Sequence, residues 1–123
     1  MLFKVEQIDH VQLAAPISGE DSARKFYGDL LGFEEVTKPV SLRNRGGVWF
    51  QFGMVHVHIG VEDDFHPAKK AHPAFRVKNL EAMKQYLHAK NVAFKTDDKL
   101  PGATRFYLDD PFGNRLEFLE WSD

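Results

Sequence analysis

The hydrophobic and polar positions along the first half of the chain follow two periods that predict a strand, a helix and three more strands. Residues 7–15 alternate as in a strand, and Ser18 is placed to cap a helix over 20–31, where apolar side chains recur every three or four positions. Gly32 is a suitable stop for that helix. A strand follows at 33–38, and the stretch 48–61 predicts two strands joined tightly at Gly53.

The second half predicts the same order of elements. After a polar stretch at 62–71 without apolar period, residues 72–78 form a strand, and Asn79 can cap a helix whose apolar side is Leu80, Met83, Tyr86 and Leu87. A short strand is predicted at 92–96. The segments ATRFYLDD and RLEFLEW then form two strands joined by the turn PFGN.

This repetition predicts an α+β fold of paired βαβββ modules. The whole chain, 1–123, is expected to be one domain made of module 5–61, linker 62–71 and module 72–121. The two sheets would join into one curved mixed sheet around a central cavity, so that equivalent residues of the two halves face each other.

Composition narrows the class of protein. The chain has 123 residues, a formal net charge of −2 and no cysteine. The absence of a basic field argues against nucleic acid as a partner, and the absence of thiols excludes cysteine nucleophiles and thiolate metal sites. No apolar stretch approaches the roughly 20 residues that span a bilayer. We expect a soluble, cytoplasmic protein.

Strand alternation separates polar side chains from apolar ones. In VHVHIG, His56 and His58 lie on the face opposite Val55, Val57 and Ile59. Other predicted strands divide in the same way, and their polar faces carry His10 and Gln12, His72 and Arg76, Arg105 and Tyr107, and Arg115 and Glu117.

Four of these residues occupy equivalent positions in the two halves. His10 and His58 lie on the first and last strand of one half, and His72 and Glu117 lie on the first and last strand of the other. Grouped titratable side chains are costly without compensation. A divalent metal would supply it, and three imidazoles with one carboxylate suit Zn, Fe, Ni, Co or Mn better than Ca or Mg.

Four motifs carry a family resemblance: IDHVQLA, ARKFYGDLLGFE, AHPAFRVKN and FYLDDPFGNRLEFLE. Through them, roughly residues 5–121 resemble the vicinal oxygen chelate superfamily of glyoxalase I, bleomycin-resistance proteins, fosfomycin-resistance thiol transferases and extradiol dioxygenases. The resemblance implies a metal held by residues of the first and last strands of the modules.

The resemblance assigns roles residue by residue. His10, His72 and Glu117 match the metal ligands of dioxygenases and fosfomycin transferases, and His58 stands where glyoxalase I places a carboxylate. A histidine there removes a proton-shuttling group and leaves a formal positive charge, which favours an anionic or enolate-like substrate.

Other residues are expected to contact the substrate. Tyr107 matches a tyrosine near the substrate of fosfomycin transferases and, with Glu117, is the predicted catalytic residue. Gln12 stands where those enzymes have threonine, and their potassium-binding loop is not recognisable. The remaining candidates are His56 as a cavity neighbour and Arg76, Arg105 and Arg115, whose guanidinium groups can clamp a carboxylate or phosphonate.

The sequence therefore predicts a metal-dependent enzyme that chelates a small oxygen-bearing substrate. Lyase or isomerase, dioxygenase and thiol-transferase chemistry all fit. The alternative is a non-catalytic resistance protein that sequesters a small molecule or antibiotic. We expect a homodimer, with modules paired within one chain or between two, and expect the loops at 39–47 and 97–103 to select the substrate.

Overall fold

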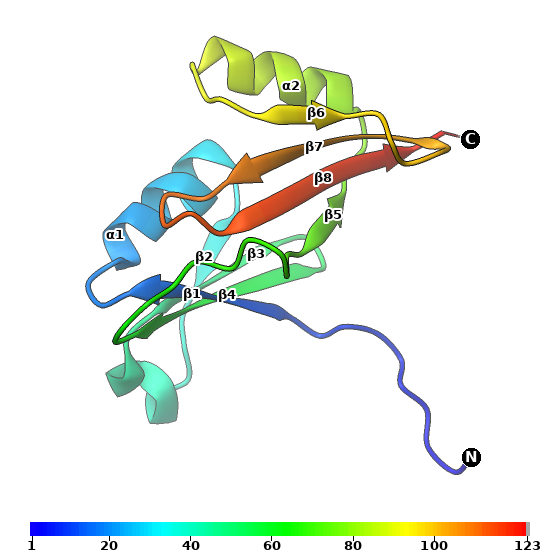
Figure 1. Cartoon of the computed structure of the whole chain (residues 1–123). Helices are drawn as coiled ribbons and strands as arrows, with labels where there is room; N and C mark the ends of the chain where they lie inside the picture. The colour runs from blue at the N-terminus through cyan, green and yellow to red at the C-terminus, as the bar shows by residue number, and fades with distance from the viewer. Residues whose placement is uncertain (123) are drawn as a thin grey trace. The chain divides into compact units, whose positions relative to one another are not determined.

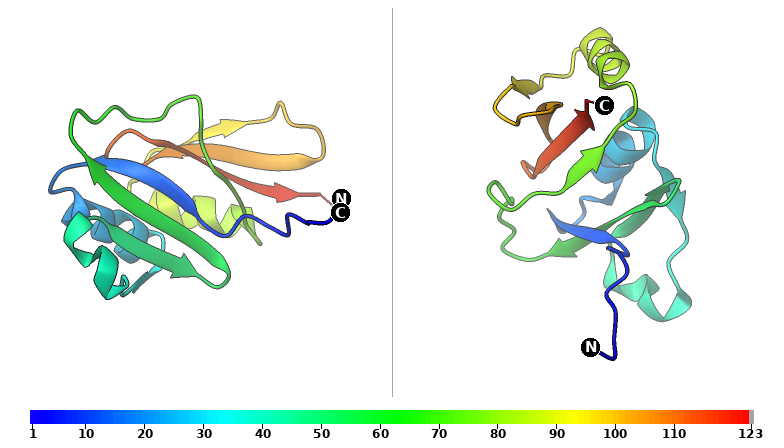
Figure 2. Two further views of the ribbon diagram at one scale, coloured as in Figure 1. Left: turned by 90° about the horizontal axis from the view of Figure 1, so that it is seen from below. Right: turned by 90° about the vertical axis from the view of Figure 1, so that its right-hand side faces the viewer.

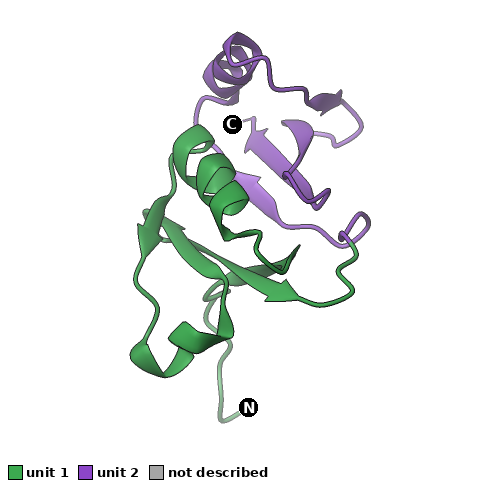
Figure 3. Ribbon diagram, turned by 90° about the vertical axis from the view of Figure 1, so that its left-hand side faces the viewer, with its two compact units in different colours: residues 1–66 green, residues 67–123 purple. Residues whose placement is uncertain are grey.

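The computed structural model describes residues 1–122 and divides the chain into two compact units. These are Met1–His66 and Pro67–Asp123, coloured separately in Figure 3. Their boundary falls inside the predicted linker. The joining of the two modules into a single domain around a shared cavity stays a prediction, and each unit is described by itself.

The first unit is a four-stranded sheet with helical segments between its strands (Figure 1). Its strands run in the order β1-β4-β3-β2; β1 is parallel to β4, and the other neighbours are antiparallel. Along the chain the elements are β1 (Val11–Pro16), α1 (Glu20–Ala23), η1 (Arg24–Leu30, a π-helix), β2 (Glu34–Val36), η2 (Val40–Arg45, a 3-10 helix), β3 (Val48–Phe52) and β4 (Val55–Glu62).

The second unit repeats this topology. Its sheet has the order β5-β8-β7-β6, again with a parallel pair between its first and last strands. The elements are β5 (Ala74–Arg76), α2 (Leu80–Ala89), β6 (Lys95–Asp97), β7 (Ala103–Asp109) and β8 (Arg115–Trp121). The α+β class and the duplicated βαβββ order are thus confirmed. Within residues 1–122 no helix is both long and apolar enough to cross a membrane.

Each unit buries its own apolar face. In the first, η1 presents the buried Tyr27 to Phe50 of β3, with 5.7 Å between ring centroids. In the second, Phe94 contacts Phe106, Phe106 contacts Phe118, and Phe118 contacts Phe75, at centroid distances of 4.8, 5.4 and 5.3 Å. The apolar positions of the strand alternation therefore form the two cores.

The predicted first strand begins later than expected. Residues 7–10 lie outside β1, and the segment before Val11 runs away from the sheet of the first unit (Figure 2). Its apolar side chains are exposed, Ile8 by 79%. Alternation fixes which face a residue would occupy, but a strand also needs a hydrogen-bonding partner, and β4 pairs with this segment only from Val11 onward.

The predicted helix over 20–31 is also corrected. Its first turn is α-helical, but the backbone N–H of Leu31 bonds to the carbonyl of Phe26, five residues earlier, so the rest is a π-helix. Spacings of three and four residues do not distinguish these hydrogen-bond patterns. Ser18 does not cap: its φ is 73°, and Gly19 is the N-cap, without a side-chain hydrogen bond.

Two glycines bring the loop after η2 against β4. Gly47 has a φ of 83°, and a Cβ there would lie 2.3 Å from the carbonyl oxygen of Ile59. Gly46 has a φ of 72°, and its Cβ would lie 2.9 Å from a methyl of Val61. Only glycine fits this conformation and approach, so the predicted loop at 39–47 is a defined structure rather than a generic connection.

The start of α2 is capped twice. The Asn79 side chain accepts a hydrogen bond from the N–H of Ala82, at 3.1 Å, which confirms the predicted cap. The Glu120 carboxylate of β8 also accepts the N–H groups of Asn79 and Leu80, both at 2.9 Å. These backbone hydrogen bonds lower the pKa of Glu120 below its ordinary value of 4.5.

Replacing Glu120 with glutamine is expected to lower the urea midpoint at pH 7, because a neutral amide accepts these N–H groups more weakly. A lowered folded-state pKa means that the carboxylate stabilises the fold above pH 4.5 and that this contribution is lost as pH falls through the folded pKa. The difference between wild type and E120Q should therefore narrow in acid.

Glu81→Gln is the matched control, since it removes a first-turn charge of α2 without removing these two hydrogen bonds. Equal midpoints for E120Q and wild type at pH 7 would contradict the capping role.

Candidate functional site

Three rings stack on the polar face of the first unit's sheet. The imidazoles of His10 and His58 have centroids 4.1 Å apart, and the indole of Trp49 lies 3.9 Å from His58 with an interplanar angle of 4°. Trp49 and His58 are register partners across β3 and β4, which explains their contact. Oδ2 of Asp9 lies 2.9 Å from Nδ1 of His10.

The environment of His58 favours the neutral ring. Burial of the ring, followed by the neighbouring imidazoles of His10 and His56, lowers the pKa of His58 below its ordinary value of 6.5. A neutral imidazole is the form that binds a metal. Gln12 is the register partner of His58 on β1, and His56 lies two positions along β4 on the same face. The structure thus groups all four polar candidates of this unit on one sheet face.

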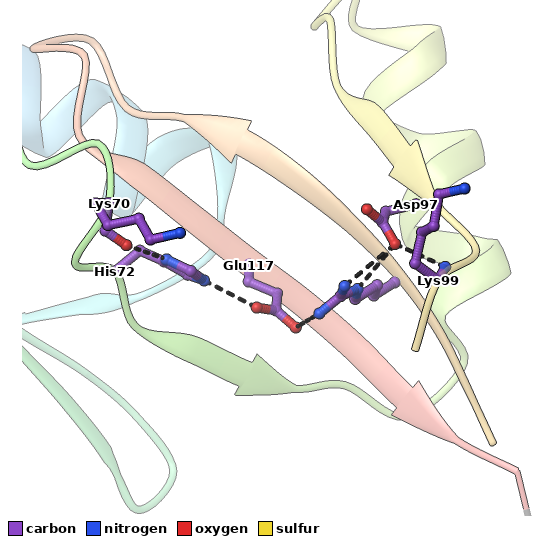
Figure 4. A network of polar contacts seen from close by, with 6 residues as sticks. Lys70, His72, Asp97, Lys99 and Glu117 are labelled. Atoms are coloured by element: carbon purple, nitrogen blue, oxygen red, sulfur yellow. Dashed lines mark hydrogen bonds and ion pairs between the residues drawn. The ribbon is translucent and has the colours of Figure 1, made fainter. Parts of the chain in front are cut away.

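In the second unit, His72 and Glu117 are in direct contact. Nε2 of His72 lies 2.9 Å from Oε1 of Glu117, and Nδ1 of His72 lies 2.9 Å from the carbonyl oxygen of Lys70 (Figure 4). Glu117 is buried, with 6% of its surface exposed. A carbonyl only accepts hydrogen bonds, so Nδ1 carries the hydrogen and Nε2 is directed at the carboxylate.

Arg105 holds the other oxygen of Glu117. Its guanidinium donates to Oε2 of Glu117 at 3.2 Å and, through two further N–H groups, to Oδ1 of Asp97 at 3.2 and 3.3 Å. These ion pairs offset the cost of burying the Glu117 charge. Arg105 is therefore placed to orient the Glu117 carboxylate.

Tyr107 lies at the centre of this group. It is the register partner of Glu117 across β7 and β8, and its ring contacts the His72 ring edge-to-face at 5.6 Å. The guanidinium carbons of Arg105 and Arg115 lie 5.4 and 5.1 Å from the tyrosine centroid. Arg76 is exposed on β5. It is the register partner of Leu119 and lies on the face that Glu117 occupies.

The predicted metal ligands thus divide into two pairs, one in each unit. Within residues 1–122, no group of three or more metal-binding side chains is gathered. The four-residue metal site of the sequence analysis therefore stays a prediction.

Two residues of these groups, Trp49 and Asp97, are not among the candidates predicted from the sequence. Trp49 could have been found, because alternation in VWFQF places it on the face of β3 that meets His58. Asp97 could not, since nothing in KTDDK indicates that its carboxylate reaches Arg105 across β6 and β7.

The fold and these polar faces define a protein of the class built from duplicated βαβββ modules. A sequence model of the Glyoxalase/Bleomycin resistance protein/Dioxygenase superfamily matches residues 7–118. The chain belongs to this superfamily. A search of curated proteins gives no significant match.

Solved structures agree with this membership. A crystal structure described as a glyoxalase family protein from Bacillus anthracis is 48% identical, with 99% of this chain and 100% of that chain covered and a TM-score of 0.96. Two more distant structures share the fold. A glyoxalase family protein from Enterococcus faecalis is 23% identical, with 98% and 100% covered and a TM-score of 0.71. The fosfomycin resistance protein FosX from Listeria monocytogenes is 15% identical, with 97% and 96% covered and a TM-score of 0.74.

The lowered pKa of His58 has a measurable consequence. In the unfolded chain His58 takes up a proton near pH 6.5, whereas in the folded chain it stays neutral to lower pH. The folded state should therefore lose stability as pH falls from 6.5 toward the lower pKa of folded His58. An NMR titration should give a His58 midpoint below 6.5, and His58→Gln should flatten this part of the stability profile.

His88→Gln, at an exposed position of α2, is the control and should leave that profile unchanged. A His58 midpoint at or above 6.5 would show that the ring is not held neutral.

Proposed function

We propose that this protein is a metal-dependent enzyme of the glyoxalase superfamily that acts on a small oxygen-bearing substrate. The observation that carries the proposal is the His72–Glu117 pair. The two atoms that could bind a metal, Nε2 and Oε1, lie 2.9 Å apart, while Nδ1 contacts the Lys70 carbonyl and Oε2 accepts from Arg105. His10 and His58 are proposed to complete the ligand set.

The chemistry of the pair fits a divalent transition metal. The Nδ1–H of His72 donates to a backbone carbonyl, the arrangement that directs the Nε2 lone pair of a ligating histidine at its metal. Nε2 of His72 and Oε1 of Glu117 lie side by side, and together they would offer one nitrogen and one carboxylate oxygen to a cation. Zn, Fe, Ni, Co and Mn all accept such a nitrogen and oxygen pair.

The chain's own residues supply the remaining functions. When bound, the cation would act as a Lewis acid toward two oxygens of the substrate. Arg105 keeps the Glu117 carboxylate in place through Oε2. The Tyr107 phenol, beside His72, would orient the substrate or donate a proton to it.

Further polar side chains would bind the substrate. Arg115 and Arg76 are available for an anionic group, and Gln12 and His56 offer hydrogen bonds on the sheet face of the first unit. Lyase or isomerase, dioxygenase and thiol-transferase reactions all fit such a set of residues.

Protein purified without a metal-affinity tag is expected to carry a stoichiometric transition metal by elemental analysis. Glu117→Gln should abolish retention, and Arg105→Met should weaken binding by about 10–100-fold, as outer-shell changes do. At metal concentrations 100-fold above Kd, the bound ion stabilises the fold by about 2.7 kcal/mol, so a chelator should lower Tm by several degrees.

His66→Gln is the matched control, because Nδ1 of His66 also faces a carbonyl two residues earlier, whereas within residues 1–122 no carboxylate forms a hydrogen bond with its Nε2. Absence of metal from the wild type, with Tm unchanged by chelator, would refute the proposal and favour the non-catalytic binding protein.

We also propose that the protein forms a homodimer. The segment before β1 exposes Met1, Leu2, Phe3, Val5 and Ile8, each by at least 69%. In the first unit, β1 is an edge strand that pairs only with β4. Exposed apolar residues next to an open strand edge favour association with a second chain.

Light scattering with size-exclusion chromatography should give twice the chain mass of 14.1 kDa. Replacing Phe3 and Val5 with serine should shift the equilibrium toward monomer, whereas replacing the exposed Val40 of η2 with serine should not. A monomeric wild type at high micromolar concentration would contradict the dimer.

A further inference from the structure

A cavity of about 260 Å³ opens in the first unit beside the stacked rings. Gln12 and Gly60 line it from β1 and β4, Trp49 from β3, and Lys38 and Arg45 from the loop around η2. Trp49 contacts His58, so the cavity adjoins a candidate metal ligand on the same sheet face. Nothing in the proposed ligand set uses it.

The charged residues that line this cavity are both cations. The Lys38 ammonium donates to the carbonyl of Gly46, which leaves donors of the group for another partner. Arg45 is exposed and forms no hydrogen bond or ion pair with any residue of 1–122. The nearby Glu20 carboxylate accepts the N–H of Gly47 at 3.0 Å and does not line the cavity. Two cations without a facing acid favour an anion.

The loop that carries these cations is held in place. The close approach of Gly46 and Gly47 to β4 fixes its far end, and Nε of Arg43 donates to the carbonyl of Lys38 at 3.1 Å at the near end. The two cations are therefore presented to the cavity by a defined backbone, which lowers the entropic cost of binding.

The rest of the lining suits a small organic body with one polar end. A Cβ at Gly60 would lie 2.7 Å from Nε2 of Gln12, so the missing side chain makes room for this amide on the sheet. Leu42, Ile59 and Val61 add apolar surface. Since a cavity of roughly 150 Å³ holds benzene, the volume admits a single ring or short chain with an acidic group.

We infer that this cavity binds the acidic end of a small organic anion, a carboxylate, phosphonate or phosphate monoester. Lys38 and Arg45 would bond its oxygens, with the Gln12 amide as a further donor, and the apolar lining would contact its carbon skeleton. That this anion is the substrate rests on the proposed function. The binding itself requires no metal.

The test uses the full, isotope-labelled chain after chelator treatment, so that no probe binds through a metal. Phenylphosphonate, benzoate and the neutral benzamide are titrated while amide and indole N–H resonances are followed by NMR. The two anions should shift the Trp49 indole and the Gly46 and Gly60 amides, and benzamide should not. Comparing the anions also shows which acidic group is preferred.

Lys38→Met and Arg45→Met should each weaken anion binding about tenfold, the factor that 1.4 kcal/mol represents, and the double variant should weaken it further. Lys25→Met removes a charge at an exposed position of η1 and should leave anion binding unchanged. If Lys38→Met fails to fold, as its spectrum would show, Arg45→Met at an exposed position still tests the inference.

Equal binding of benzamide, shifts that map away from the cavity, or full affinity in the Arg45 variant would overturn the inference. Anion binding by a protein that holds no metal would refute the proposed enzyme and leave the anion site intact. Retention of a metal without anion binding would support the proposed enzyme and refute the anion site.

Discussion

Parallel pairing between the first and last strand of each module positions every pair of candidate ligands. β1 aligns Gln12 with His58, and His10 stacks on the same ring; β5 aligns Ala74 with Glu117, and His72 reaches the same carboxylate. Side chains of neighbouring strands at one register level share a face. The polar groups of each unit are therefore adjacent because these strands pair, although long stretches of sequence separate them.

The second unit buries a charged carboxylate on its polar sheet face, and the first unit, over residues 1–66, does not. Glu117 is buried, and an isolated carboxylate there would be costly. Arg105 donates a hydrogen bond to one of its oxygens and supplies the opposite charge, and Asp97 in turn accepts from the guanidinium. In the first unit, burial of the ring and the neighbouring imidazoles lower the pKa of His58, which favours its neutral form. The second unit thus presents a carboxylate beside an imidazole, and the first presents imidazole rings alone.

Much of this arrangement could be predicted from the sequence. Period-two alternation in VHVHIG assigned His56 and His58 to one face. The motif positions assigned His10, His72 and Glu117 to the first and last strands of the modules; Glu117 lies in β8, whereas His10 and His72 lie just before β1 and β5. The Asn79 cap was predictable because side-chain capping is local. Arg105 was predicted on the correct face, but its ion pairs with Glu117 and Asp97 depend on rotamers and distances that alternation does not encode.

The sequence by itself determined the element order, the faces of the strands and the duplicated module, because these follow from local periodicity and local turn chemistry. Only the tertiary structure decided which side chains touch. The second cap of α2 by Glu120 and the cavity lined by Gln12, Lys38 and Arg45 both join segments distant in sequence. The Trp49–His58 stack joins neighbouring strands, and its geometry depends on their register. These contacts depend on strand register and on glycine backbones that let loops approach a sheet, and register is a property of the paired strands rather than of either strand alone.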